Sequence, residues 1–462
     1  MKCVFGIAFI IWGNLPGNAL QLGVFMQQAI NPTCHESDGC LNRGYAVAWG
    51  VGVLTLCAFL NVATREYVIE LNNVFAVLKL GFVAVITLVG IGYGAVHGDG
   101  CRRITWDPID QRDASNLGDI ALALFFAMYP YTGYEQPFYV LSEVSDAQTR
   151  FAPATYSAML VVMILFPLAN LSYLCMVPYT GNAGLPENMA LAVIERLSGI
   201  SPTTPSGDRN PAAVRAVSAL LAIFIFGNLM AQTYTASRVK AEIAKEGILP
   251  FSITLSKRYE TLFSRVGRLF TSTPRPPLSD VDGSREHAPF PATVLHWTFE
   301  IILILAFGLT MDPRDAYGGL TYMYTYVIFG VFGFLTAAGL LYEKLGLEPN
   351  RDRRWPELSR GRPWLDPVPA VVATICLGFL LFAAFARPSP GKGAGWPWWV
   401  GPTVGLGSVF LGALWWGGMR FFRWYGSWKL VIDRIPIVRI RQGVPVQVGE
   451  VVKHTTVAVV RQ

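Results

Sequence analysis

Long apolar runs alternate with short polar, charged or proline-containing segments along almost the whole chain. A helix needs about 20 predominantly apolar residues to cross the hydrocarbon core of a bilayer. Ten runs are long enough, or nearly so, and we expect each of them to form a membrane-spanning helix. They are residues 3–30, 45–62, 71–96, 117–139, 154–178, 213–235, 292–310, 319–342, 367–386 and 398–418.

Two segments depart from this pattern. Segment 236–291 begins as a charged continuation of the preceding helix and then becomes polar and proline-containing, as is typical of a disordered loop. From Trp428 the tail alternates apolar and polar residues, as in VIDRIPIVRIRQGVPVQVGEVV, which is typical of β-strands. We interpret the tail either as a floppy or loosely docked cytosolic extension or as a segment at the membrane surface. No soluble domain of any size is apparent.

The composition supports a helical membrane protein. Hydrophobic residues make up 52% and charged residues 15% of the chain, whereas an ordinary soluble domain is about 25% charged. The net charge of +6 reflects basic loops between apolar runs, so no nucleic-acid partner is expected. One set of alternate loops, with the tail, holds about 25 Lys and Arg, against about 10 in the opposite set. We therefore predict an integral membrane protein with both termini cytoplasmic, most simply in the plasma membrane.

The residues that usually carry catalysis or bind metals are scattered. Seven cysteines lack metal-site spacing, five histidines form no group, and no Walker, Rossmann or triad motif occurs. We expect neither an enzyme nor a cofactor. Four cysteines in apolar runs are interpreted as packing residues: Cys3, Cys57, Cys175 and Cys376. Three more fall in loops assigned to the outside, where one disulfide can form: Cys34, Cys40 and Cys101.

Charged residues within the apolar runs are few, and each costs at least ~2.5–3.5 kcal/mol to insert at the centre of a membrane helix. Lys79 lies eight residues into its run. It either extends to the interface or acts as a cation held against a broken helix. Glu300 is expected to face a neighbouring helix or a polar patch without taking part in transport, and Asp119 to lie near the interface.

Residues 129–138, YPYTGYEQPF, interrupt the fourth run with two prolines, a glycine and a carboxylate. Irregular backbone at membrane depth is tolerated only where it lines a cavity or is buried in protein. Transporters use such breaks, because the ends of two half-helices present unpaired N–H and C=O groups to a charged substrate. Gly133 permits unusual dihedral angles, and Tyr131 and Tyr134 offer ring faces. The alternative is a kinked but intact helix.

These residues resemble a known family. The run FFAMYPYTGYEQPFYVLSEV resembles the sixth helix of the amino acid–polyamine–organocation superfamily. The run FGNLMAQTYTASRVKAEIAKEGILPF resembles its eighth helix and the signature that follows. NNVFAVLKLG resembles the fifth helix, which carries a lysine in several cation-independent members. The resemblance covers nearly all of residues 1–418 and is greatest to the L-type branch, especially the fungal methionine permeases.

The resemblance implies an all-α polytopic membrane protein with the LeuT-like fold, in which ten of twelve helices form two inverted repeats of five. On this alignment the chain begins at the third helix and lacks the first two, and with them half of the usual binding site. Residues 1–96 would be the remainder of the first repeat and 97–342 the second, with its cytoplasmic loop 236–291. Residues 343–418 would be the last two helices, and 419–462 a cytoplasmic tail.

The resemblance also implies secondary-active transport of a neutral L-amino acid, with methionine as one candidate, by alternating access. The alternative is a non-transporting amino acid sensor or an inactive truncated permease. Lys79 would be the coupling or structural cation in a proton-coupled cycle, and Glu135 would cap or orient the broken helix. The substrate would meet Tyr129, Tyr131, Thr132, Gly133, Tyr134, Glu135 and Asn18.

Two of these assignments have an alternative. Asn18 lines the site or makes a helix–helix hydrogen bond. Arg238, on the eighth helix of the family pattern, helps to form a cytoplasmic gate or anchors its span at the interface. The bilayer and a small amino acid are the expected partners, and no obligatory protein partner is expected.

Overall fold

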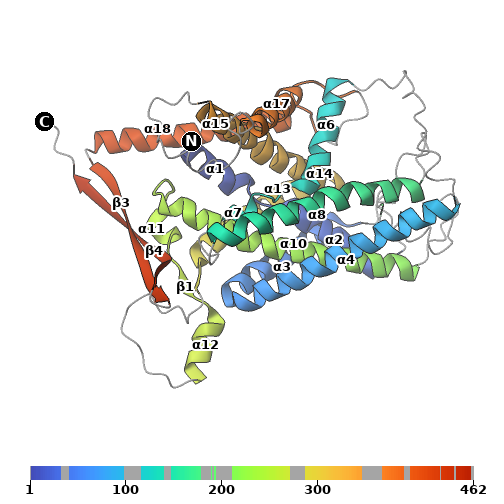
Figure 1. Cartoon of the computed structure of the whole chain (residues 1–462), viewed down its shortest axis with the longest axis horizontal. Coiled ribbons are helices and arrows are strands. Elements are labelled where there is room, and N and C mark those ends of the chain that lie inside the picture. The colour runs from blue at the N-terminus through green and yellow to red at the C-terminus, as the bar shows by residue number, and fades with distance from the viewer. Residues whose placement is uncertain are drawn as a thin grey trace.

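The computed structural model describes residues 2–32, 41–97, 116–139, 147–177, 189, 192–193, 211–270, 287–345, 367–389, 396–426, 428–441 and 444–458. Most of them lie in helices (Figure 1). The helices are α1 (Lys2–Trp12), α2 (Pro16–Ile30), α3 (Arg43–Ala63), α4 (Glu66–His97), α6 (Leu117–Met128), η3 (Tyr129–Tyr131), α7 (Gln136–Tyr139), α8 (Ala147–Met176), α10 (Pro211–Lys245), α11 (Ser252–Leu255), α12 (Leu262–Phe270), α13 (Phe290–Gly308), α14 (Pro313–Tyr324), the π-helical η5 (Thr325–Gly333), α15 (Phe334–Lys344), α17 (Val368–Ala383) and α18 (Val400–Tyr425). The strands are β1 (Tyr259–Glu260), β2 (His287–Ala288), β3 (Trp428–Arg441) and β4 (Val444–Ala458).

The apolar helices match the predicted spans. Within the described ranges, eight segments are long and apolar enough to cross a membrane, and two shorter apolar helices cover Leu117–Tyr131 and Val368–Ala383. Together they coincide with the ten runs expected from hydropathy. The polar part of the 236–291 loop and most of the 343–366 loop lie outside the described residues, as do Cys34, Cys40 and Cys101.

The first span contains a break that hydropathy did not predict. It was expected as one helix over 3–30, but α1 ends at Trp12 and α2 begins at Pro16. Proline lacks an N–H and cannot continue the ladder of the preceding turn. The side-chain amide of Asn14 donates to the carbonyls of Ile10 (3.1 Å) and Ile11 (2.8 Å). The carbonyls at the end of α1 are therefore satisfied although the helix stops.

Small residues bring the helices of the first apolar core together. This core lies among α2, α3, α10 and α13 and includes Leu20, Leu54 and Ile304. At Gly23 an added Cβ would lie only 2.3 Å from the carbonyl oxygen of Ala46. Only glycine allows the backbones of α2 and α3 to approach so closely, as is common between membrane helices.

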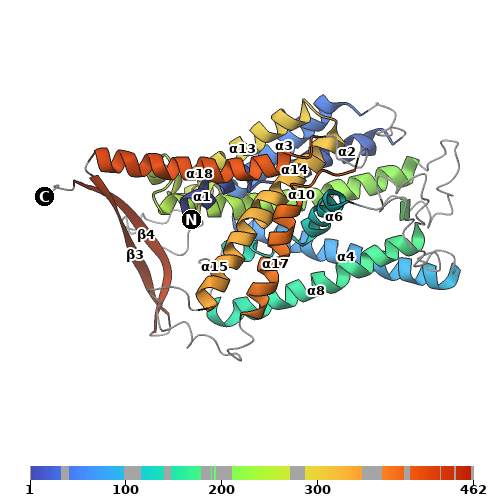
Figure 2. The ribbon, with the colours of Figure 1, turned by 90° about the horizontal axis from the view of Figure 1, so that it is seen from above.

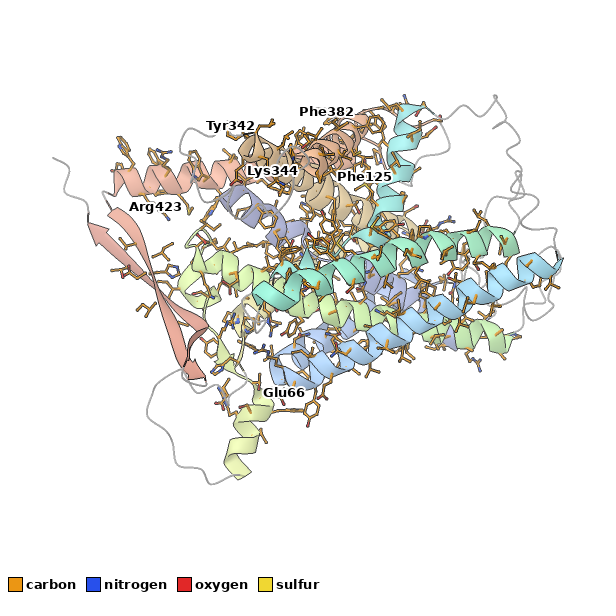
Figure 3. All side chains as sticks on the ribbon, in the orientation of Figure 1. Glu66, Phe125, Tyr342, Lys344, Phe382 and Arg423 are labelled. Carbon is orange, nitrogen blue, oxygen red and sulfur yellow. The ribbon has the colours of Figure 1, made fainter. Side chains whose placement is uncertain are left out.

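The second apolar core lies among α1, α6, α10, α14, η5, α17 and α18. Phe125 of α6 is 1% exposed, and its ring centroid lies 5.2 Å from that of Tyr322 on α14. By contrast, Phe382 of α17 is 68% exposed and points away from the bundle (Figure 3). Apolar side chains thus fill the interior and also cover the outer surface, as expected for helices in contact with lipid.

Helices α4 and α8 run side by side along one flank of the bundle (Figures 1 and 2). Each is only 22% buried over its most apolar window, so most of their apolar surface faces outward. Ser172 of α8 donates to the carbonyl of Ile86 on α4 (3.0 Å). One prediction is wrong here: Cys175 is disulfide-bonded rather than a simple packing residue. Hydropathy could not reveal this, because a cysteine near the end of a span looks the same in either role.

The tail forms a long β-hairpin rather than a floppy extension. β3 and β4 pair antiparallel from Trp428↔Ala458 to Arg441↔Val444, with an irregularity at Ile437 and Val438. The alternating pattern therefore predicted the strands correctly. The hairpin lies at one end of the bundle beyond α18 (Figure 2). It docks there, since Nε2 of His454 lies 2.9 Å from the carbonyl oxygen of Lys245 at the end of α10.

Candidate functional site

The fourth apolar span breaks where the sequence predicted. α6 begins with a capping box between Asn116 and Asp119 and ends at Met128. The 3₁₀ turn of η3 follows, then four turn residues, before the short α7 starts at Gln136. Gly133 has φ +100°, a value that residues with a Cβ rarely adopt. The segment is therefore unwound rather than merely kinked.

The position of α6 is set by polar contacts at its first turn. The carboxylate of Asp119 accepts hydrogen bonds from the backbone N–H (2.8 Å) and hydroxyl (2.6 Å) of Ser389. The side-chain amide of Asn116 donates to the carbonyl of Arg387 (2.8 Å). These bonds join α6 to the segment that follows α17, so the unwound residues at the other end of α6 start from a fixed helix.

Local hydrogen bonds hold the unwound segment in shape. The carboxylate of Glu135 accepts from the backbone N–H of Gly133 (3.0 Å), and the hydroxyl of Tyr324 on α14 faces the same carboxylate. The hydroxyl of Thr132 donates to the carbonyl of Tyr129 (2.6 Å). Glu135 thus satisfies a backbone donor that no helix pairs, which is the task of a helix cap.

The structure brings two of the predicted binding residues together from distant parts of the chain. The hydroxyl of Tyr129 donates to Oδ1 of Asn18 on α2 (2.8 Å). Asn18 is 6% exposed, so this bond closes the inner side of the broken helix. Asn18 makes a helix–helix hydrogen bond, and it does so at the break itself. Its role in lining a binding site stays a prediction.

Aromatic rings surround the rest of the segment. Tyr131 packs edge-on against Phe166 of α8, with ring centroids 4.9 Å apart. Tyr134 is 44% exposed and lies 5.6 Å from the ring of Phe329 in η5. The break is therefore lined on two sides by apolar ring faces, which suit an apolar side chain of a small ligand.

Helix α10 adds polar groups that the sequence did not single out. Nε2 of Gln136, the first residue of α7, donates to Oε1 of Gln232 on α10. The hydroxyl of Thr235, also on α10, donates to Oε1 of Gln136 (3.2 Å). The only signal available beforehand was an amide and a hydroxyl in an otherwise apolar run. That pattern is too common in membrane helices to identify a contact with the break.

Lys79 is not joined to the break. It lies in α4 between Phe75 and Phe82, whose rings contact rings of α10 at centroid distances of 5.9 Å and 5.1 Å. Residues at this spacing share one face of a helix, so Lys79 lies on the side of α4 that faces α10. Within the described ranges, Lys79 makes no hydrogen bond or ion pair. Its role as a coupling cation stays a prediction.

Arg238 on α10 is buried, at 3% exposure. Its guanidinium carbon lies 3.3 Å from the ring centroid of Tyr234, and Nη1 donates to the carbonyl of that residue (3.0 Å). The guanidinium is therefore enclosed by protein, and the alternative that Arg238 anchors its span at the interface stays a prediction. Its role in a cytoplasmic gate stays a prediction.

The break thus combines backbone polar groups, a carboxylate, amides, hydroxyls and rings at membrane depth. In the part of the chain that the structure describes, no group of three His, Cys, Asp or Glu side chains is arranged to hold a metal ion. An unwound segment of this kind within a bundle of apolar helices defines a polytopic membrane transporter.

Comparison with known proteins identifies the family. The chain belongs to the amino acid permease family, whose model matches residues 2–409. This match covers both the α1–α2 break and the α6–α7 break. Family membership places the chain among integral membrane transporters rather than enzymes.

Individual relatives are distant and longer than this chain. The high-affinity methionine permease of Saccharomyces cerevisiae is 21% identical over 446 residues, covering 93% of this chain and 67% of the permease. The large neutral amino acids transporter small subunit 2 of Oryctolagus cuniculus is 25% identical over 233 residues, or 50% of this chain and 40% of the transporter. The methylthioribose transporter of Bacillus subtilis is 25% identical over 199 residues, or 43% and 38%. The aligned part spans less than half of these two relatives.

Proposed function

We propose that this protein carries out secondary-active transport of neutral L-amino acids, with methionine as the first substrate to test. Two observations support the proposal. The unwound segment from Tyr129 to Glu135 faces polar and aromatic groups from α2, α8, α10 and η5. Moreover, a methionine permease is among the relatives that align over most of the chain.

In this proposal the substrate binds beside the α6–α7 break. An amino acid carries an ammonium and a carboxylate that must keep hydrogen-bond partners when they leave water. Backbone carbonyls near Thr132 would receive the ammonium, and backbone N–H groups near Gly133 the carboxylate, as half-helix ends do in transporters. The rings of Tyr131 and Tyr134 would hold an apolar side chain. Alternating access would then expose this site to one side of the membrane at a time.

The remaining parts of the proposal concern topology. The inverted-repeat division into 1–96, 97–342, 343–418 and 419–462 follows the family pattern. The excess of Lys and Arg in alternate loops supports both termini being cytoplasmic, in the plasma membrane. The docked hairpin, which contains Lys and Arg, would then lie on the cytoplasmic side.

The experiment is reconstitution of the purified full chain in liposomes, with uptake of labelled methionine measured by counterflow exchange. Counterflow needs no ion gradient, so it tests binding and alternating access alone. Glu135→Ala should reduce exchange at least about tenfold, the loss expected when one hydrogen bond to a charged group worth ~1.5–3 kcal/mol is removed. Glu343→Ala, a carboxyl at the end of α15 away from the break, is the control and should leave exchange unchanged. Absence of exchange of any neutral amino acid by correctly inserted wild-type protein would refute the proposal.

A further inference from the structure

Four polar side chains meet where the α1–α2 break faces α10 and α13. Lys240 and His296 are 0% exposed, Glu300 is 1% exposed and Asn14 is 2% exposed. Ionisable groups enclosed at membrane depth are costly and are retained where they pair or carry function. Glu300 was expected to face a polar patch, and this cluster is that patch. The sequence did not identify Lys240 or His296, because they lie 56 residues apart in separate spans.

The four side chains form a continuous chain of contacts. Nζ of Lys240 donates to Oδ1 of Asn14 (2.7 Å) and lies 3.0 Å from Nδ1 of His296. On the other side of the ring, Nε2 of His296 lies 3.5 Å from Oε2 of Glu300. The backbone N–H of Leu15, within the α1–α2 break, lies close to the same carboxylate. An imidazole therefore stands between an ammonium and a carboxylate.

This cluster is incompletely paired. Nε2 of His296 and Oε1 of Glu300 are both buried, and neither has a hydrogen-bond partner. Buried polar atoms of native proteins are nearly always paired, so each exception needs an explanation. A purely structural ion pair would be expected to satisfy its own atoms. Unpaired atoms on both the ring and the carboxyl are instead what a site needs if it is to accept a further proton.

Two arrangements that differ by one proton fit the same heavy atoms. In both, the Lys240 ammonium and Nδ1–H of His296 donate to Oδ1 of Asn14, the latter over 2.7 Å, so Nε2 carries no proton and faces Glu300. In the first, Glu300 is ionised. In the second, its carboxylate has gained one proton at Oε2 from water on one side of the membrane, and the neutral carboxylic acid faces Nε2 as a donor.

The cluster is mechanically linked to the candidate substrate site. Asn14 lies in the α1–α2 break, four residues before Asn18, which accepts the hydrogen bond from the hydroxyl of Tyr129. Lys240 lies about two turns after Gln232, which accepts from Gln136 at the start of α7. The same two elements, the α1–α2 span and α10, therefore contact both the cluster and the α6–α7 break. A proton that changes the Lys240–Glu300 attraction acts on the helices that hold the break.

We propose that Lys240, His296 and Glu300 form the proton-binding site that couples amino acid movement to a proton gradient. The inference rests on the proposed transport function and assigns coupling to this cluster rather than to Lys79. Each cycle would load one proton onto the ionised Glu300 carboxylate from one side of the membrane and release it from Glu300 on the other side. Lys240 would stay an ammonium throughout, and Nε2 of His296 would accept a hydrogen bond from the protonated carboxyl group. Lys240 belongs to α10, and His296 and Glu300 belong to α13. Among the other described residues, the Cys57 thiol of α3 is a titratable group that interacts electrostatically with Glu300.

The test compares wild type with Glu300→Gln, which keeps the shape of the side chain but cannot gain or lose a proton. In liposomes whose exterior is about one pH unit more acidic than the lumen, one-proton symport supports about tenfold accumulation of methionine. We expect wild type to approach that ratio and Glu300→Gln to fall to about onefold, that is, to no accumulation. Counterflow exchange by Glu300→Gln should stay within a few-fold of wild type. Glu343→Gln is the matched control and should accumulate methionine normally.

A second measurement does not depend on transport. Infrared difference spectra of the purified protein between acid and alkaline pH should show the C=O band of a protonated carboxylic acid that is absent in Glu300→Gln. His296→Leu removes the ring nitrogen that faces the Glu300 carboxyl group but keeps both charged partners, so it should alter this band and abolish accumulation. If the band is the same in wild type and Glu300→Gln, or if Glu300→Gln accumulates methionine like wild type, the proposal is wrong. If wild type shows the Glu300 band but exchanges no amino acid, the proton site stands and the transport proposal falls.

Discussion

Gly133 provides the sharpest test of the unwound segment, because its cost can be worked out from the structure. A Cβ added at this position meets nothing closer than 3.7 Å, the distance to Nε2 of Gln136. Steric overlap therefore adds nothing to the free-energy cost of Gly133→Ala, which arises only because alanine must adopt a φ of +100°. Forcing an L-residue into left-handed backbone costs roughly 1–2 kcal/mol. The substitution should therefore destabilise the break and nothing else.

This penalty predicts two measurable changes. With an unfolding entropy of about 2.1 cal/mol/K per residue, the 462-residue chain should lose about 1–2 °C in its thermal midpoint. If the substrate binds the unwound conformation, the affinity for methionine should fall by a factor of about 5–30, since binding must first restore that conformation. Thermal unfolding of the detergent-solubilised protein gives the first quantity, and a binding isotherm with labelled methionine gives the second.

Gly92→Ala is the matched control. Gly92 lies within α4, and an added Cβ there meets nothing within 4 Å. Alanine is a better helix former than glycine by roughly 0.5–1 kcal/mol, so the thermal midpoint should stay unchanged or rise, with methionine affinity unaltered. Equal midpoints and equal affinities for Gly133→Ala and wild type would show that the break does not need left-handed backbone, and the account of the site would fail.

Three further predictions concern single contacts. Tyr129→Phe removes the donor to Asn18 and leaves a buried amide oxygen unpaired, so the free energy of unfolding should fall by about 1–3 kcal/mol. A double-mutant cycle with Asn18→Leu measures the coupling energy of the two residues. A coupling energy near zero would show that the bond does not contribute to stability. Trp415→Phe removes the bond from Nε1 to the carbonyl of Ile248 (2.6 Å) and should cost about 1 kcal/mol, seen as a lower midpoint without loss of exchange. If coupling resides at Lys240 and Glu300, Lys79→Gln should leave proton-driven methionine accumulation within about twofold of wild type, which corresponds to a free-energy change below ~0.4 kcal/mol. Loss of accumulation would instead assign the coupling role to Lys79.

The sequence by itself determined the membrane class, the number of apolar spans and the position of the α6–α7 break. Each of these follows from local properties. Whether a segment lies in the membrane or in water depends on the apolar character of about twenty consecutive residues. The break depends on Pro130, Gly133 and Pro137, whose backbone restrictions act within a few residues. The strands of the tail were visible for the same reason, because alternation is a local pattern.

Only the tertiary structure decided which polar groups meet. Asn18 and Tyr129 are 111 residues apart, and Lys240 contacts Asn14 across 226 residues. Hydropathy reports how apolar a span is but not which face of it turns inward. The α1–α2 break was missed although Gly13 and Pro16 carry the same kind of local signal, because the span was assigned from its hydropathy and the break contains no charged residue. The buried cluster became visible only when α10 and α13 were packed against that break, since the distances that make it a candidate proton site depend on helix packing.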